Sequence, residues 1–181
     1  MRELSKKQEG QSKMTSDFAV KVQSKAEYHL RILKAVDRWC GIPYRFHCNA
    51  KGGIDCRFFL YSYLKEAGVE LPWGEVSKYY APNWTEGYGG PDPYIAWFTE
   101  NGIQIPLEKV EVGDIYLFSM MSRRYVTHSG IALDNVRFIH CPQPRVGIDR
   151  IVEKRWNKRL KAIYRLNAIE RLPNEEVRKN V

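Results

Sequence analysis

Cys56 is the residue of this 181-residue sequence that is best placed to act as a nucleophile. It follows the glycines of KGG and Asp55, and apolar residues recur after it at helical spacing, which predicts a helix from about residue 55 to 67 that ends at Gly68. In the first turn of a helix, unpaired backbone N–H groups and the helix dipole favour a thiolate, so a lowered pKa is expected for the thiol. A small buried core cysteine is the alternative interpretation.

A nucleophilic thiol also needs a base and a group that orients the base. His128 begins the predicted strand SGIAL, and His140 ends the predicted strand VRFI. If these strands are antiparallel neighbours, their histidines come together and, facing the first turn of the helix, form a Cys–His–His set with Cys56. Histidines at strand ends are more often ordinary surface or half-buried residues, and spacing alone leaves both interpretations open.

The elements that must position these residues can be read from the hydrophobic pattern. An apolar stripe through Leu30, Leu33, Val36 and Trp39 predicts a first helix that stops at Gly41. The second half of the chain consists of short apolar or alternating runs separated by turns, which predict strands of a largely antiparallel sheet: DIYLF, HSGIAL, VRFIH, RVGID and KAIYRL.

Helices followed by strands indicate an α+β fold, with N-terminal helices packed on a largely antiparallel β-sheet. We expect a polar N-terminal arm over residues 1–25, one domain over residues 26–166 and a C-terminal tail over residues 167–181. The N-terminus has no apolar core of the kind found in secretory signal peptides, so synthesis in the cytoplasm is expected. No segment has the roughly 18 apolar residues that a membrane span requires.

The formal net charge of +8 favours an anionic partner, and the basic residues are densest in the run RIVEKRWNKRLKAIYR. No zinc-finger, helix-turn-helix or RNP signature accompanies this run, so nucleic acid is not expected, and a solvated basic face is the simpler interpretation. The sequence predicts no oligomeric state.

Four cysteines are present, and without an export signal they are not expected to form disulfides. The adjacent pairs His47–Cys48 and His140–Cys141 are the only candidates for a zinc site. Adjacent side chains rarely point to the same centre, and zinc ligands are usually spaced two to four residues apart. We therefore expect no metal.

The stretch GIPYRFHCNAKGGIDCRFFLYSYLKEAGVELP resembles the opening of an NlpC/P60 cysteine peptidase. That family shows a G-x-PY-x-x-GG segment, then G-x-DCSG at the start of a helix, then G-[IV]-x-LP. Farther along, VEVGDIYLF, THSGIAL and FIH resemble the strand that starts with GD, the strand that bears the catalytic histidine and the strand that bears the third catalytic residue. The resemblance covers about residues 26–166, with five motifs in the family's order.

The resemblance implies a papain-like fold in which Cys56 is the nucleophile, His128 the base and His140 the residue that orients it. It also implies that Tyr44 and Asp55 contact the substrate. The family's usual substrate is the peptidoglycan stem peptide, cut between D-γ-glutamate and the diamino acid, and the chemistry uses no metal or organic cofactor.

The sequence departs from the family at two places. Arg57 stands where the family has serine, and it is expected to lower the pKa of Cys56, to bind a substrate carboxylate or to point outward. His47 and Cys48 replace the two glycines after PY. These changes leave two alternatives open: a thiol amidase or acyltransferase of the same fold, or a non-catalytic binding module such as a phage-tail component. Delivery to the cell wall by a phage or a secretion apparatus is expected for an endopeptidase that lacks a signal peptide.

Overall fold

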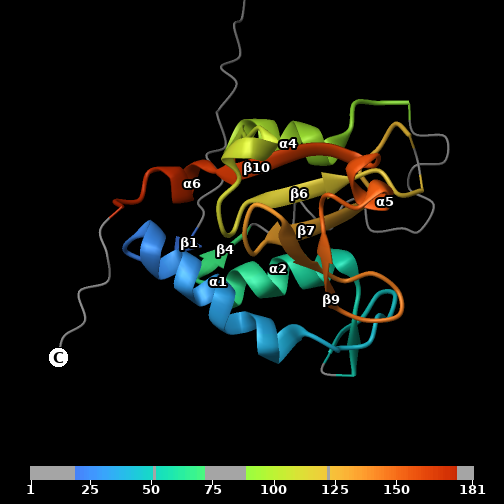
Figure 1. Cartoon of the computed structure of the whole chain (residues 1–181), viewed down its shortest axis with the longest axis horizontal. Coiled ribbons are helices and arrows are strands. Elements are labelled where there is room, and N and C mark those ends of the chain that lie inside the picture. The colour runs from blue at the N-terminus through green and yellow to red at the C-terminus, as the bar shows by residue number, and fades with distance from the viewer. Residues whose placement is uncertain (1–18, 51, 72–88, 122, 175–181) are drawn as a thin grey trace, which may run out of the picture.

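A computed structural model of the chain describes residues 19–50, 52–71, 89–121 and 123–174. Two N-terminal helices pack on one side of a six-stranded antiparallel sheet, with strand order β5-β10-β6-β7-β8-β9 (Figure 1). The α+β fold class expected from the sequence is confirmed. The helices are α1 (Lys25–Trp39), α2 (Cys56–Glu66), α4 (Pro93–Asn101), α5 (Lys154–Asn157) and α6 (Asn167–Glu170), with a 3-10 turn η1 (Leu107–Lys109).

All five predicted strands are present, and they form the sheet together with one further strand. That further strand, β5, lies at the sheet edge beside β10. The strands of the sheet are β5 (Gly102–Gln104), β6 (Ile115–Phe118), β7 (His128–Ala132), β8 (Arg137–His140), β9 (Gly147–Arg150) and β10 (Leu160–Leu166). Two small ribbons pair β1 (Ala19–Val20) with β4 (Val69–Glu70) and β2 (Asn49–Ala50) with β3 (Gly53–Ile54).

The centre of the sheet is buried on both faces, as strand β6 illustrates. Ile115 and Leu117 belong to the core shared with α1 and α2, whereas Tyr116 and Phe118 belong to a second cluster that contains Trp156 of α5. Successive side chains of a strand point to opposite faces. The central strands are therefore apolar on both sides, which is why they read as short continuous hydrophobic runs.

Helix α1 forms where it was expected, but only part of its predicted apolar stripe, Val36 and Trp39, packs against the core. The buried residues are Tyr28, Ile32 and Ala35, while Leu30 and Leu33 are 42% and 45% exposed. The Tyr28 hydroxyl donates a hydrogen bond to the Gly113 carbonyl at 3.1 Å. This contact is with a distant segment and fixes the rotation of the helix, which periodicity within the helix alone does not reveal.

Helix α2 matches its prediction closely. Its buried face consists of residues from the expected stripe, namely Phe59, Leu60, Tyr63 and Leu64, and Gly68 follows in a left-handed conformation with φ +95°. The helix packs on β7 and β8. Its first residue therefore lies against the part of the sheet that carries the two histidines.

Segments outside the predicted domain boundaries also contact the core. In the N-terminal arm, β1 pairs with β4 and Val22 is buried; in the C-terminal tail, α6 buries Ile169. Residues 1–18 and 175–181 lie outside the described ranges. None of the helices in the described ranges is long and apolar enough to cross a membrane.

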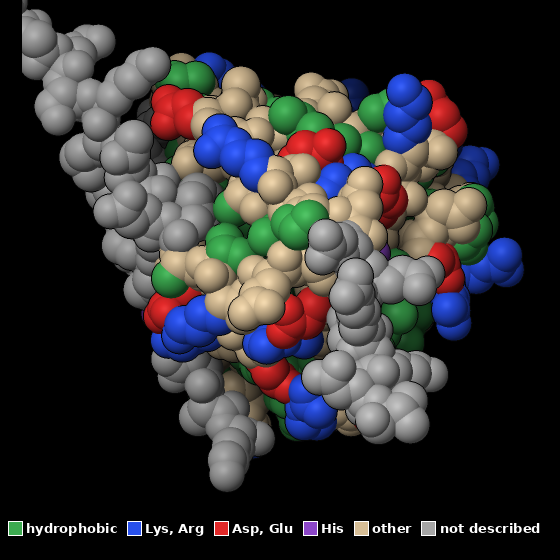
Figure 2. Space-filling view, turned by 90° about the vertical axis from the view of Figure 1, so that its left-hand side faces the viewer, with side chains coloured by type: hydrophobic (Ala, Val, Ile, Leu, Met, Phe, Trp, Pro, Cys, Tyr) green, Lys and Arg blue, Asp and Glu red, His purple; other side chains and the backbone are tan. Residues whose placement is uncertain are grey.

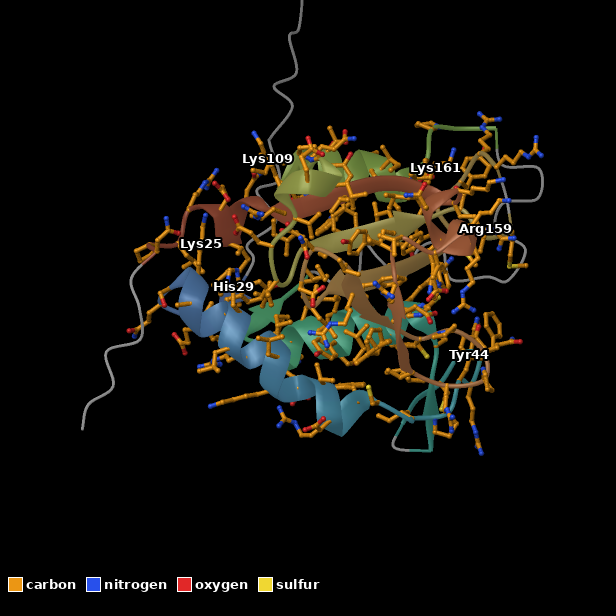
Figure 3. All side chains as sticks on the ribbon, in the orientation of Figure 1. Lys25, His29, Tyr44, Lys109, Arg159 and Lys161 are labelled. Atoms are coloured by element: carbon orange, nitrogen blue, oxygen red, sulfur yellow. The ribbon has the colours of Figure 1, made fainter. Side chains whose placement is uncertain are left out.

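Charge is unevenly distributed over the chain. Figure 2 shows the side that bears α1 and α6, where acidic and basic side chains alternate, and ion pairs such as Lys25–Glu170 and Arg31–Glu27 lie on these helices. By contrast, residues 145–161 hold seven Lys or Arg against two Asp or Glu, so this segment contributes +5 to the net charge of +8. Arg159 and Lys161, at the end of this segment, lie on the side that bears α5 (Figure 3).

Candidate active site

Cys56 is the first residue of α2, as predicted, and its thiol is half-buried. Asp55 caps the helix: its Oδ1 accepts from the backbone N–H groups of Arg57 and Phe58 at 3.0 and 3.1 Å, and its Oδ2 accepts from the N–H of His47 at 3.1 Å. The cap leaves the thiol at the N-terminal end of the helix. There, Cys56 Sγ lies 4.0 Å from the carbonyl oxygen of Thr127, the residue before His128.

The expectation of a lowered thiol pKa was wrong. Burial raises the pKa of Cys56 to about 12, and the charge of Asp55 acts in the same direction. The guanidinium of Arg57 and nearby backbone N–H groups act in the opposite direction, but they do not outweigh burial. Cys56 is therefore a protonated thiol at neutral pH, and a base must remove its proton for the sulfur to react.

The two histidines come together as the strand pairing predicted. Strand β8 runs antiparallel to β7 with His140 opposite Gly130, and His128 Nε2 lies 2.8 Å from His140 Nδ1. His140 is fully buried and His128 is 9% exposed. Burial lowers the pKa of each to about 3, so both imidazoles are neutral at neutral pH.

The hydrogen bonds that begin at His128 continue beyond His140 to residues that the sequence analysis did not identify. His140 Nε2 lies 3.0 Å from Asp149 Oδ2. The same carboxylate accepts from Trp156 Nε1 at 3.0 Å and from Arg155 Nη2 at 2.7 Å. In the structure, β9 places Gly147 opposite His140. Asp149 lies two residues farther along β9 and therefore points to the same face of the sheet as His140.

Cys56 and His128 line the same cleft, which has a volume of about 240 Å³. Within the described ranges, no hydrogen bond joins the Cys56 thiol to His128, and the thiol donates instead to the Thr127 carbonyl. Besides Cys56 and His128, the walls carry polar side chains, namely Arg57, Tyr61, Tyr94, Glu100, Thr127 and Ser129. The remaining surface is mainly apolar and comes chiefly from α2, α4 and the segment before β7, including Leu60, Leu71, Pro93, Trp97, Phe98 and Val126.

The three residues expected to contact substrate differ in their positions. Arg57 lines the cleft, with its guanidinium carbon 5.6 Å from the centre of the Tyr94 ring, so it does not simply point outward. Tyr44 is half-buried, and burial raises the pKa of its hydroxyl to about 12. Asp55 is 2% exposed and holds three backbone N–H groups, so the structure gives it a capping role.

The other two histidines are not part of the histidine pair: His29 is distant, whereas the backbone N–H of His47 bonds to Asp55 beside Cys56. His29 is on α1, far from Tyr44 in the view of Figure 3. His47 has a left-handed backbone with φ +57°, at a position where the family pattern has glycine. In the part of the chain that the structure describes, no three His, Cys, Asp or Glu side chains are grouped so as to hold a metal ion.

Solved structures with the same architecture come from several bacteria. An NLP/P60-family protein from Staphylococcus aureus is 23% identical, with a TM-score of 0.57 over 77% of this chain and 41% of that one. An NlpC/P60-family protein from Bacillus cereus is 18% identical, with a TM-score of 0.58 over 80% and 40%. The peptidoglycan hydrolase RipB from Mycobacterium tuberculosis is 12% identical, with a TM-score of 0.51 over 78% and 65%.

These likenesses establish the fold, and this chain spans about two fifths of the Staphylococcus and Bacillus proteins. No curated protein sequence matches the chain. Residues 41–165 match the model of the NlpC/P60 family, and this segment contains Cys56, both paired histidines and Asp149. Because the match covers well over half of its length, the chain belongs to the NlpC/P60 family.

Proposed function

We propose that this protein is a cysteine endopeptidase that hydrolyses an amide bond in peptidoglycan stem peptides, between D-γ-glutamate and the diamino acid. The observation that carries the proposal is the hydrogen-bonded pair of buried, neutral histidines on the wall of the cleft that holds Cys56. A neutral imidazole is competent to accept the proton of the thiol. The bond and the substrate are those that the family resemblance implies, and the solved structure of the peptidoglycan hydrolase RipB is similar in fold.

The reaction begins with the transfer of the Cys56 proton to His128 as the sulfur attacks the carbonyl carbon. The backbone N–H of Cys56, at the start of α2, stabilises the oxyanion that forms. The C–N bond then breaks, His128 returns the proton to the leaving amine, and a thioester remains on Cys56. Water, deprotonated by His128, hydrolyses the thioester and restores the thiol.

The high pKa of the thiol makes the base indispensable to this mechanism. With the thiol pKa near 12 and the imidazole pKa near 3, the resting pair is neutral rather than an ion pair. Proton transfer to His128 must therefore accompany the attack by the sulfur.

The charge distribution suits an anionic polymer. Residues 145–161 contribute +5, and they include Trp156, whose ring lies 5.9 Å from His128 and 4.6 Å from His140, measured between ring centres. A cationic surface next to the site raises the local concentration of an anionic substrate. Delivery to the cell wall by a phage or secretion apparatus stays a prediction.

The apolar lining of the cleft favours a second candidate, a thiol amidase or acyltransferase that acts on another substrate. Most of the exposed lining is contributed by aliphatic and aromatic side chains, which suit an apolar acyl group better than a polar peptide. The chemistry at Cys56 is the same in both cases, and the two candidates differ only in the acyl group and the acceptor.

The deciding experiment incubates purified sacculi and isolated stem peptides with the protein, with Cys56→Ala and with Cys40→Ala, and identifies the products by mass spectrometry. Cys40 is exposed and lies at the end of α1, so its variant controls for loss of a thiol outside the site. A new fragment with a free amine on the diamino acid, absent only with Cys56→Ala, is the expected result.

Absence of any fragment from every wall type, while Cys56 still reacts faster than Cys40 with iodoacetamide, would sink the endopeptidase and favour the second candidate. If Cys56 is also no more reactive than Cys40, the protein is a non-catalytic binding module.

A further inference from the structure

Asp149 lies at the end of a chain of hydrogen bonds that begins at His128. Its carboxylate holds three donors, from His140, Trp156 and Arg155, at 2.7 to 3.0 Å. Trp156 and Arg155 belong to α5, which packs at the end of the sheet where β7 begins (Figure 1). All but one of the Lys and Arg side chains of the basic run are exposed, as expected of a solvated face, but Arg155 and the buried Trp156 also bond to Asp149.

The position of each proton in this chain follows from counting donors and acceptors. The indole and guanidinium N–H groups can only donate, and an ionised carboxylate can only accept. His140 Nε2, 3.0 Å from Asp149 Oδ2, must therefore carry a proton. A neutral imidazole has a single N–H, which leaves His140 Nδ1 as an acceptor.

The same count of donors and acceptors assigns the proton on His128. Its Nε2 lies 2.8 Å from the acceptor Nδ1 of His140, so this Nε2 must be the donor. The remaining nitrogen of His128, Nδ1, then has a free lone pair. The opposite arrangement would place an unprotonated His140 Nε2 against the negative oxygen of Asp149, with two acceptors facing each other at 3.0 Å.

We infer that Asp149 is a positioning residue that fixes the tautomers of both histidines, so that His128 offers Nδ1 as the base for Cys56. Arg155 and Trp156 hold the carboxylate in place for this task. The inference rests on the nucleophile and base of the proposed function, but not on the identity of the substrate. A purely structural ion pair is the alternative, since Arg155 also binds Glu153 at 2.9 Å.

Asp149→Asn tests the inference, because an amide has both a donor and an acceptor and no longer selects one tautomer. Glu153→Gln is the matched control: it neutralises another carboxylate bound to Arg155 but does not touch the histidines. The assay is the rate at which iodoacetamide alkylates Cys56 at neutral pH, resolved by peptide mass spectrometry, with Cys40 as the internal reference. No peptidoglycan substrate is required.

We expect Asp149→Asn to slow the alkylation of Cys56 by about 10- to 100-fold, the size of one charged hydrogen bond. Cys40 should be unaffected, and Glu153→Gln should react like the wild type. Alkylation of Cys56 at the wild-type rate in Asp149→Asn would overturn the inference, and so would equal slowing in both variants.

A second measurement avoids the question of whether the variant folds. Long-range ¹H–¹⁵N spectra of the wild-type imidazoles distinguish protonated from unprotonated ring nitrogens. The proton should be found on Nε2 of both His128 and His140, and a proton on Nδ1 of His140 would contradict the inference. If these results hold but no stem peptide is cleaved, the substrate assignment fails and the role of Asp149 stands.

Discussion

Acid should destabilise this fold through its buried histidine pair. Burial lowers the pKa of His128 and His140 from the ordinary value of 6.5 to about 3. Between these values the unfolded chain binds two protons that the folded protein excludes. The stability that the two neutral histidines contribute to the fold is therefore complete above pH 6.5, and it is lost progressively as the pH falls toward 3.

The size of the effect follows from the two pKa values. At pH 5.0 each histidine lowers the free energy of unfolding by about 2 kcal/mol relative to pH 7.5, so the pair lowers it by about 4 kcal/mol. This result hardly changes for any folded pKa below about 4, because at pH 5.0 the unfolded value sets the loss. A typical domain has only about 5–15 kcal/mol of stability in total, so the change is large.

Urea denaturation at pH 7.5 and pH 5.0 measures the loss in the wild type, in the double variant His128→Gln/His140→Gln and in the control His47→Gln. Burial raises the pKa of Asp55 and of Asp114, which opposes the histidines, but these groups are present in all three proteins. The wild type and the control should lose about 4 kcal/mol more than the double variant between the two pH values. Equal losses in the wild type and the double variant would refute the reasoning.

Substitutions elsewhere test three local contacts, each by urea denaturation at pH 7.5. Asp55→Ala removes a buried cap that holds three N–H groups and should cost about 2–4 kcal/mol; a loss below about 1 kcal/mol would contradict the capping role. Gly113→Ala places a methyl group against the Tyr28 ring at a backbone φ of +87°, which should cost about 2–4 kcal/mol, and no cost would argue against this packing. His47→Gly relieves a left-handed backbone and should stabilise the protein by up to about 1 kcal/mol, whereas destabilisation would show that the imidazole itself contributes.

Local patterns in the sequence predicted the features that depend on short stretches of chain. The buried stripe of α2 follows from residues within one helix, and the meeting of His128 with His140 follows from two strands joined by a short turn. The position of Cys56 at the start of α2 was predicted in the same way, because it depends on the neighbouring Asp55, which caps the helix.

Features that depend on distant segments were missed. The rotation of α1 is set by the bond between Tyr28 and Gly113, 85 residues away. The high pKa of Cys56 comes from burial, which no stretch of sequence displays. Asp149 was overlooked because its role requires the register of β9 as well as the donors that α5 supplies.

The order of the residues along the chain has a consequence for the newly made protein. Cys56 leaves the ribosome about 100 residues before Trp156, which corresponds to roughly 5–20 s of synthesis. Until the end of that interval the chain lacks α5, whose Arg155 and Trp156 hold the Asp149 carboxylate. If Cys56 is the nucleophile that we propose, the site is therefore complete only late in synthesis, after α5 has been made and has packed on the sheet.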